Sequence, residues 1–284
     1  KKMIAENFTE LLALQKQYNA PLLYEAACCA SIPIIRNLEE YYDNDLLESI
    51  EGIVNGSTNY ILTKTFEENI SYQQALKQAQ EKSYAESDPS LDTGGYDAKY
   101  KLLILLAHAF GIIARPDEIF NIGIDSIGDV ELQYAKEKNL KIKLVAQAFK
   151  TNNNTVASFV LPKFVSQHDK LFTVDDVFNG VLTKTSFADQ QFFSGKGAGA
   201  YPTASAVLSD ISALRYHYKY EYKKLNDLCV LEDSSRVFMK VFLRHNLIDL
   251  SYLKRYFQEI EESYLNHQIG YVIGLISLEN VKIV

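Results

Sequence analysis

The segment YAESDPSLDTGGYDAKYKLLILLAHAFGII, residues 84–113, joins an acidic loop to a long apolar run. The spacing of its apolar residues predicts a buried helix over 96–110, and Gly94 and Gly95 let the backbone turn sharply into it. Asp97 falls in the first turn, where the helix dipole favours a carboxylate. Lys101 follows four residues later on the same face of the helix. The segment therefore predicts a carboxylate–lysine pair at the start of a buried helix.

Helical and strand-like patterns alternate on both sides of this segment. The predicted helices cover 6–18, 33–42, 56–69, 71–83, 96–110, 130–139 and 201–217, and Ser57, Thr58 and Asn59 are suitable caps for the third of them. The predicted strands cover 20–26, 46–56, 119–127, 141–150, 155–165, 178–187 and 190–200. Further on, a strand at 236–246, a helix at 251–263 and a strand at 269–284 predict a small β-α-β module. The whole pattern predicts an α/β or α+β fold, with a mixed sheet covered by helices.

The composition excludes several classes of protein. With 47% hydrophobic and 23% charged residues, the chain of 284 residues has the composition of a soluble globular protein. Its net charge of −7 argues against a nucleic-acid partner, and no apolar run reaches the roughly 18 residues of a membrane span. Cys28, Cys29 and Cys229 form neither a disulfide framework nor a zinc pattern. Reduced thiols and a cytoplasmic location are the expectation.

The acidic segment has two interpretations. Glu86, Asp88 and Asp92 lie in the loop before the helix, so several carboxylates converge near Lys101. Such carboxylates can bind an ammonium group, and a lysine among them can stay charged and donate a proton, or have its pKa lowered if it is partly desolvated. The alternative is a solvated acidic loop beside an ordinary helix ion pair, which is common and weak.

Three further segments carry possible chemistry. SGKGAGAYPTASA, residues 194–206, lets a backbone approach a ligand closely before a helix, although a glycine-rich turn is the simpler alternative. It does not match the GxGxxG dinucleotide fingerprint. GIVNGSTNYI, residues 52–61, has the same strand–glycine–helix order. YEAACCASIP, residues 24–33, places one acid beside small residues whose carbonyls could surround a cation.

Three of these segments together resemble the catalytic region of homoserine dehydrogenases. GIVNGSTNYILTK, YAESDPSLDTGGYDAKYKLLIL and GKGAGAYPTASAVLSDI follow one another with the family's order and spacing, from about Lys1 to Ile211. The resemblance implies reversible reduction of L-aspartate 4-semialdehyde to L-homoserine with NAD or NADP, in threonine and methionine biosynthesis. It also implies a small-molecule substrate and a homodimer or homotetramer.

The resemblance also implies roles for single residues. Lys101 is the implied proton donor to the aldehyde oxygen, Lys1 a second lysine near substrate and nicotinamide, and Glu86 an acid at the reacting group. The implied substrate-binding residues are Gly56, Ser57, Tyr84, Glu86, Asp92 and Asp97. Lys1 and Gly197 are the implied cofactor contacts. A sodium ion is implied at Glu25 and the carbonyls of Cys28, Ala30 and Ile32.

Four parts are expected along the chain. Residues 1–31 would be the last helix and strand of a Rossmann nucleotide-binding domain, and 32–218 the catalytic and dimerisation domain. Residues 219–235 would be a linker, and 236–284 a module resembling ACT regulatory domains. Because the dinucleotide fingerprint is absent, an N-terminal portion is expected to be missing, and this chain alone is expected to bind NADPH poorly. The alternative is a non-catalytic oligomerisation or amino-acid-sensing module.

Overall fold

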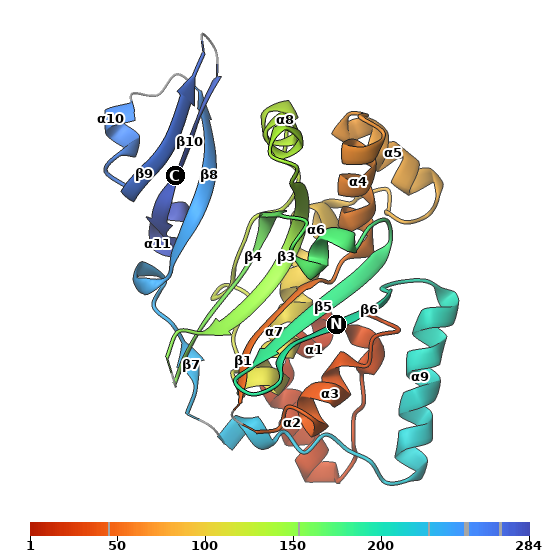
Figure 1. Cartoon of the computed structure of the whole chain (residues 1–284). Coiled ribbons are helices and arrows are strands. Elements are labelled where there is room, and N and C mark those ends of the chain that lie inside the picture. The colour runs from red at the N-terminus through yellow and green to blue at the C-terminus, as the bar shows by residue number, and fades with distance from the viewer. Residues whose placement is uncertain (45, 153, 227, 247–249, 267–268) are drawn as a thin grey trace. The chain divides into compact units, whose positions relative to one another are not determined.

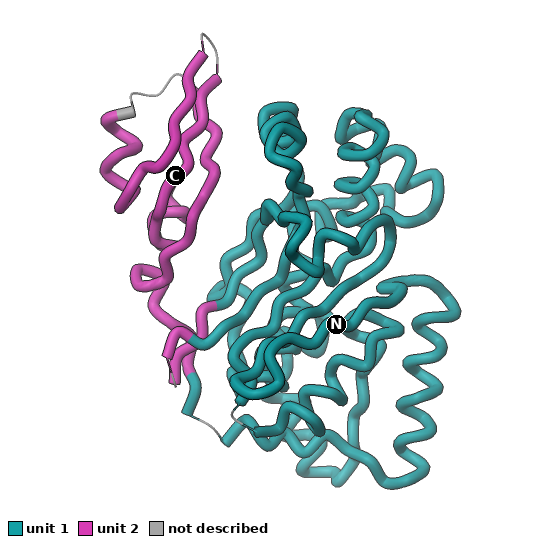
Figure 2. The backbone as a smooth tube through the Cα atoms, in the orientation of Figure 1, with its two compact units in different colours: residues 1–150, 158–229 teal, residues 151–157, 230–284 magenta. Residues whose placement is uncertain are grey.

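The computed structural model describes residues 1–44, 46–152, 154–226, 228–246, 250–266 and 269–284. They form two compact units, one of residues 1–150 and 158–229 and the other of residues 151–157 and 230–284 (Figure 2). Most of the mixed sheet and the long helices belong to the first unit, and a small antiparallel sheet, together with the first residues of β4 (Thr155–Val165) and the short strand β7 (Val230–Leu231), belongs to the second. None of the helices formed by the described residues has the length and apolar character that a membrane crossing needs.

A mixed sheet with the order β2-β4-β3-β1-β5-β6 dominates the first unit (Figure 1). Its central strand β1 pairs antiparallel with β3 and with β5, β5 and β6 form a hairpin, and β2 runs parallel to β4. The bounds are β1 Leu47–Ile53, β2 Phe120–Asn121, β3 Lys141–Lys150, β4 Thr155–Val165, β5 Phe178–Thr185 and β6 Asp189–Lys196. The predicted mixed sheet with covering helices is confirmed.

Helix α7, Tyr96–Phe110, is the buried centre of this unit. Every residue after Tyr96 is buried, and the helix packs against α1, α3, α6 and β3. Burial on all sides is the reason for its nearly uninterrupted apolar sequence. The other helices are α1 Lys2–Glu6, α2 Phe8–Tyr18, α3 Ile34–Glu40, α4 Gly56–Glu67, α5 Tyr72–Glu81, α6 Ser90–Thr93, α8 Asp129–Glu137 and α9 Ala200–Arg215.

Two strand predictions were wrong in this unit. Residues 20–26 form no strand, and a short 3-10 turn occupies Glu25–Ala27 instead. A strand is stable only beside another strand, and this segment pairs with none in the described part of the chain. The strand predicted at 119–127 shrinks to Phe120–Asn121, because the following residues turn back against the start of α7.

The second unit contains an antiparallel sheet of β8 Phe238–Asn246, β9 Phe257–Leu265 and β10 Ile269–Ser277 in the order β8-β10-β9. Leu253, Phe257, Val272 and Ile276 form its core. Short helices α10 Leu250–Leu253 and α11 Leu278–Val281 complete the module, and β7 Val230–Leu231 pairs with the first residues of β4. The prediction of a helix over 251–263 was wrong, since 257–265 is a strand whose Tyr264 stacks on Tyr271 across the sheet.

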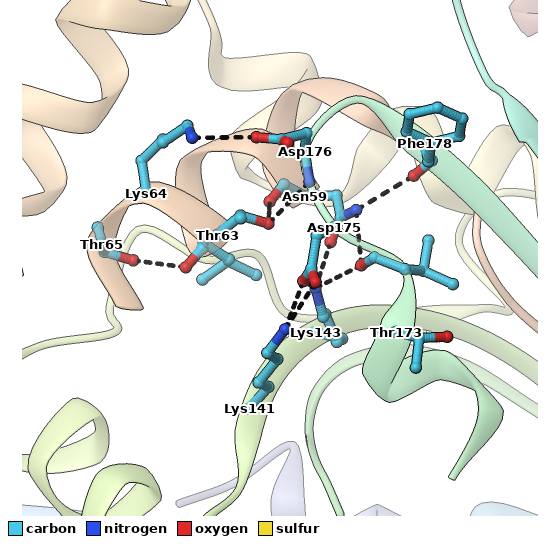
Figure 3. A network of polar contacts seen from close by, with 12 residues as sticks. Asn59, Thr63, Lys64, Thr65, Lys141, Lys143, Thr173, Asp175, Asp176 and Phe178 are labelled. Carbon is cyan, nitrogen blue, oxygen red and sulfur yellow. Dashed lines mark hydrogen bonds and ion pairs between the residues drawn. The ribbon is translucent and has the colours of Figure 1, made fainter. Parts of the chain in front are cut away.

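A buried polar network fixes α4 to the loop before β5 (Figure 3). Asn59 donates its side-chain amide to the carbonyls of Val174 and Phe178, both at 3.1 Å. The ammonium of Lys143 on β3 donates to Asn59 Oδ1 at 3.0 Å and to the Val174 carbonyl, and it pairs with Asp175 at 2.9 Å. Burial lowers the pKa of Lys143 even though Asp175 opposes the shift. The network ties together the elements on which the start of α4 rests.

Replacing Lys143 with methionine is expected to destabilise the protein by about 2 kcal/mol, because the buried Asn59 Oδ1 loses its donor and the Val174 carbonyl keeps only the bond from Asn59. Lys141→Met is a matched control: Lys141 pairs with the same Asp175 carboxylate at the edge of the network, where an ion pair contributes no more than about 1 kcal/mol. Urea unfolding of both variants measures the difference. Equal losses in the free energy of unfolding would show that the buried hydrogen bonds of Lys143 stabilise the protein no more than the ion pair of Lys141.

Candidate active site

Asn55 joins the start of α4 to the acidic segment. It is the N-cap of α4: its Oδ1 accepts the amide of Thr58 at 2.8 Å, so the caps expected at Ser57, Thr58 and Asn59 were misplaced. Its Nδ2 donates to Asp92 Oδ1 at 2.7 Å and to Asp97 Oδ2 at 2.8 Å. Burial raises the pKa of Asp92, although the bond from Asn55 opposes the shift. One asparagine thus holds two carboxylates in place.

Residues 121–124 pack against the turn before α7 and fix the direction in which the helix starts. Gly95 has a φ of 79°, which glycine adopts without strain. Asn121 donates its side-chain amide to the Gly94 carbonyl, and the amide of Ile124 donates to the Thr93 carbonyl, both at 2.7 Å. Gly123 lies so close that a Cβ there would sit 1.9 Å from the Thr93 oxygen. The direction of α7 therefore depends on close contact between two backbones.

Lys101 and Asp97 form a buried ion pair at the entry of α7. Lys101 Nζ lies 2.7 Å from Asp97 Oδ2 and donates to the Val54 carbonyl at 2.6 Å, while Lys1 pairs with the other oxygen of Asp97. Burial alone would lower the pKa of Lys101, but Asp97 together with the neighbouring Cys29 and Cys28 outweighs it, and the pKa is raised. The possibility of a lowered lysine pKa was therefore wrong. The side chain stays an ammonium that can donate a proton.

The same ion pair explains the state of Asp97. Burial raises the pKa of this carboxyl, but the ammonium groups of Lys101 and Lys1 outweigh burial and hold the pKa well below its ordinary range. A carboxylate that stays ionised keeps Lys101 charged and fixes its direction. The ion pair thus holds the Lys101 ammonium, which can donate a proton, at a fixed position.

A pocket of about 690 Å³ opens beside this pair. That volume is within the usual range for small-ligand sites. Its lining includes most of the residues singled out from the sequence: Lys1, Ala30, Gly56, Ser57, Tyr84, Glu86, Asp92, Asp97, Lys101 and Gly197. Ser57 donates its hydroxyl to the Tyr84 carbonyl, which holds α4 against the acidic loop. Carboxylates and ammonium groups on one pocket suit a ligand that carries both charges.

The glycine-rich loop between β6 and α9 forms another wall of the pocket. Gly197, Ala198 and Thr203 line it, so residues far apart in the sequence reach the same cavity. Ser31 fastens the entry of this loop, since its hydroxyl donates to the Lys196 carbonyl at 2.9 Å. The loop has no bulky side chain at 197–199 and leaves its backbone accessible to a ligand.

The residues expected to surround a cation lie partly behind this pocket. Ala30 lines it, whereas Glu25, Cys28 and Ile32 do not. The Glu25 carboxylate accepts the amides of Ile35 and Arg36 at the start of α3, at 2.8 and 3.0 Å. Burial raises its pKa to about 7 despite these bonds. Within the described chain, no three His, Cys, Asp or Glu side chains cluster as a metal site.

Several lining residues were missed in the sequence. Asn55 is the most important, and its position just before the first glycine of a helix could have identified it as a cap. Gln80 and Ser83, at the end of α5, and Cys29 also line the pocket. Nothing local marks them, because they reach the site only through the packing of α5 and of residues 24–33.

Replacing Asn55 with alanine is expected to cost about 1 kcal/mol of stability, the usual value of an N-cap, and also to lower kcat/KM, since Asp92 and Asp97 lose their common donor. Ser71→Ala is the matched control. Ser71 caps α5 with a full capping box but does not line the pocket. Thermal unfolding and steady-state kinetics on both variants test this. A kinetic loss equal to that of Ser71→Ala would contradict the role of Asn55 in the site.

The protein is expected to lose stability in acid through Asp97. A carboxyl whose folded-state pKa is depressed contributes stability above its unfolded pKa of about 4, and that contribution is lost as pH falls toward the folded value. Asp97→Asn removes this contribution at every pH. The stability gap between wild type and variant, measured by urea unfolding, should therefore narrow as pH falls from about 5 to 2. A gap independent of pH would contradict the assignment.

Comparison with known proteins adds a family relationship. The model of the family described as homoserine dehydrogenase matches residues 33–212. A homoserine dehydrogenase of Lactococcus lactis is 38% identical over 211 residues, covering 74% of this chain and 49% of that protein. A homoserine dehydrogenase of Helicobacter pylori is 39% identical over 211 residues, which cover 74% of this chain and 49% of that protein. The chain spans about half the length of the curated relatives it matches.

Solved structures agree with this relationship. A homoserine dehydrogenase from Thiobacillus denitrificans superposes with a TM-score of 0.86 at 28% identity, covering 98% of this chain and 69% of that one. A hyperthermophilic archaeal homoserine dehydrogenase in complex with NADPH gives a TM-score of 0.64 at 30% identity, covering 76% of this chain and 62% of that one.

Proposed function

Because the chain belongs to the homoserine dehydrogenase family, we propose that it carries the substrate-binding and catalytic part of an enzyme that interconverts L-aspartate 4-semialdehyde and L-homoserine with NAD or NADP. The observation that carries this proposal is Lys101, a buried ammonium held by Asp97 at the wall of a charged pocket. Threonine and methionine biosynthesis is the corresponding pathway. We further propose a cytoplasmic homodimer or homotetramer.

Reduction of an aldehyde needs a proton at the carbonyl oxygen, and Lys101 Nζ is the group that would donate it. Negative charge grows on that oxygen in the transition state, and a nearby ammonium stabilises it. Asp97 fixes the direction of Lys101, and Lys1 shares the same carboxylate. Glu86 and Asp92 line the pocket and would bind the substrate's ammonium group, while Gly56, Ser57 and Tyr84 would shape its wall.

The nicotinamide cofactor supplies the hydride when it is bound. The loop at 197–199 fits such a ligand, because Gly197 and Ala198 line the pocket with little side chain in the way. Gly197 and Lys1 would contact the cofactor. The NADPH complex of the archaeal relative supports a dinucleotide in this family.

A sodium ion is proposed beside the site, held by Glu25 and the carbonyls of Cys28, Ala30 and Ile32. Main-chain oxygens suit a hard cation. The positive φ angles of Cys29 and Ala30 curl this segment, and the Ile32 carbonyl also accepts the amide of Ile34 at 2.8 Å. A cation here would favour the ionised form of Glu25, whose pKa burial raises to about 7.

The organisation of the rest of the protein is also a proposal. We propose that residues 1–31 belong to a nucleotide-binding domain, 32–218 to the catalytic and dimerisation domain, and 219–235 to a linker. Residues 236–284 would form an ACT-like module. Their order β8-α10-β9-β10-α11 follows the first five elements of a β-α-β-β-α-β unit, which supports this proposal.

The proposal is tested with the protein carrying its whole encoded sequence. Homoserine is added with NAD or NADP, and cofactor reduction is followed by absorbance. Homoserine-dependent turnover with either cofactor is the expected result. The second candidate, an amino-acid-sensing module, rests on the fold of residues 236–284. This second candidate would be favoured by two results together: calorimetry detects binding of threonine but not of NAD or NADP, and homoserine does not lead to reduction of either cofactor.

A further inference from the structure

Asn179 on β5 is fully buried, and apart from a contact with the Cys29 thiol its side-chain amide has no hydrogen-bond partner among the described residues. The residue is 0% exposed, and both Nδ2 and Oδ1 lack any other partner. Buried polar side chains are hydrogen-bonded in the large majority of cases, so an unpaired amide needs a reason. Asn59, only slightly more exposed at 1%, shows the usual arrangement, because its amide donates to two carbonyls and accepts from Lys143.

The glycine-rich loop lies directly over the unpaired amide. A Cβ at Gly197 would lie 2.1–2.2 Å from Cγ, Nδ2 and Oδ1 of Asn179, so any side chain at this position would take the place of the amide. In the part of the chain that the structure describes, the main-chain groups of Gly197 and Ala198 form no hydrogen bond either. The buried amide of Asn179 thus lies against a peptide backbone that has no hydrogen-bond partner among the described residues.

The loop is anchored on both sides of this short stretch. Ser31 holds the Lys196 carbonyl at 2.9 Å, and the amide of Thr203 donates to the Gly199 carbonyl at 3.1 Å in the first turn of α9. Only Gly197 and Ala198 lie between the anchors, and both line the pocket. The loop is thus fixed on both sides of the two residues that lie over the amide.

We propose that Asn179 is a positioning residue for the glycine-rich loop, whose amide bonds the main chain of residues 197–198 when the nicotinamide cofactor occupies the pocket. The proposal rests on the function proposed above. Asn179 does not line the pocket, so it acts through the loop rather than on the cofactor itself. In this arrangement binding of the cofactor is coupled to pairing of the buried amide, and the loop is held against the ligand.

The test uses Asn179→Leu in the protein with its whole encoded sequence. Leucine keeps the branching of the asparagine side chain at Cγ and has no polar atoms, although it is larger. The expected result is a KM for the preferred cofactor raised about tenfold, as the loss of one to two hydrogen bonds predicts, with kcat within about twofold of wild type. The melting temperature should fall less than in Asn59→Leu, because both substitutions add the same volume but only Asn59 loses ordinary hydrogen bonds. Asn59→Leu is the control, and its melting temperature should fall more, since the Val174 and Phe178 carbonyls and Lys143 lose their bonds to Asn59.

Asn179→Thr gives a second reading if the leucine variant does not fold. Its hydroxyl can bond the loop once, so the cofactor KM should lie between those of wild type and the leucine variant. An unchanged cofactor KM in either folded variant would overturn the proposal. The proposal would also be overturned if the melting temperature of Asn179→Leu fell as much as that of Asn59→Leu while its KM for the cofactor stayed unchanged. Failure of the proposed function itself would appear separately, as a wild-type protein without homoserine-dependent turnover.

Discussion

Replacing Lys101 with methionine is expected to lower kcat about 10²–10⁴-fold, the usual contribution of a positioned general acid. Methionine keeps the length of the side chain but has no proton to give. It also leaves the buried Asp97 with Lys1 as its remaining cation. Steady-state kinetics in both directions, with circular dichroism to confirm folding, measure the effect.

Lys99→Met is the matched control for this variant. Lys99 is on the same helix and equally buried, but it lies over the ring of Tyr96 and does not line the pocket. Its replacement is expected to leave kcat within about threefold of wild type, since methionine keeps the length of the buried side chain and Lys99 neither lines the pocket nor pairs with Asp97. Equal losses in the two variants would mean that Lys101 acts through the packing of α7 and not as a proton donor.

Replacing Gly123 with alanine is expected to destabilise the protein by about 3 kcal/mol and to reduce kcat/KM strongly. The added Cβ would lie 1.9 Å from the Thr93 carbonyl oxygen and 2.5 Å from Gly94 Cα. Both are backbone atoms that cannot rotate away, and overpacking of this kind costs about 1–3 kcal/mol or more. The turn must move, and α7 with it. A displacement of about 1 Å at the reacting groups can cost about 10²-fold in rate.

Urea unfolding and steady-state kinetics of Gly123→Ala test this expectation together. A variant with normal stability would show that the two backbones can separate freely. A destabilised variant with normal kcat/KM would show that the contact of residues 121–124 with the turn stabilises the fold but does not set the direction of Lys101.

The sequence predicted best those features that depend on neighbours along the chain. Helix α7 was predicted with its observed bounds, because its apolar spacing and the Gly94-Gly95 turn are local signals. The ion pair of Asp97 and Lys101 followed from their spacing of four residues. Each of these depends on a few consecutive residues.

Features that depend on distant partners were missed or misplaced. The segment at 20–26 has the composition of a strand, but no strand of the described chain lies beside it. Residues 257–263 fall in the segment predicted as a helix, yet pairing with β10 makes them part of a strand. Asn55 contacts Asp97, 42 positions away, and Asn179 lies under Gly197. No local pattern specifies such contacts, so these residues became visible only in the folded structure.

The most direct test of this account is the rate of homoserine-dependent cofactor reduction by the wild-type protein, with its whole encoded sequence, and by its Lys101→Met variant. The account predicts turnover with NAD or NADP in the wild type and a loss of about 10²-fold or more in the variant, which should still bind homoserine. No turnover with either cofactor, or equal turnover in the two proteins, would contradict it.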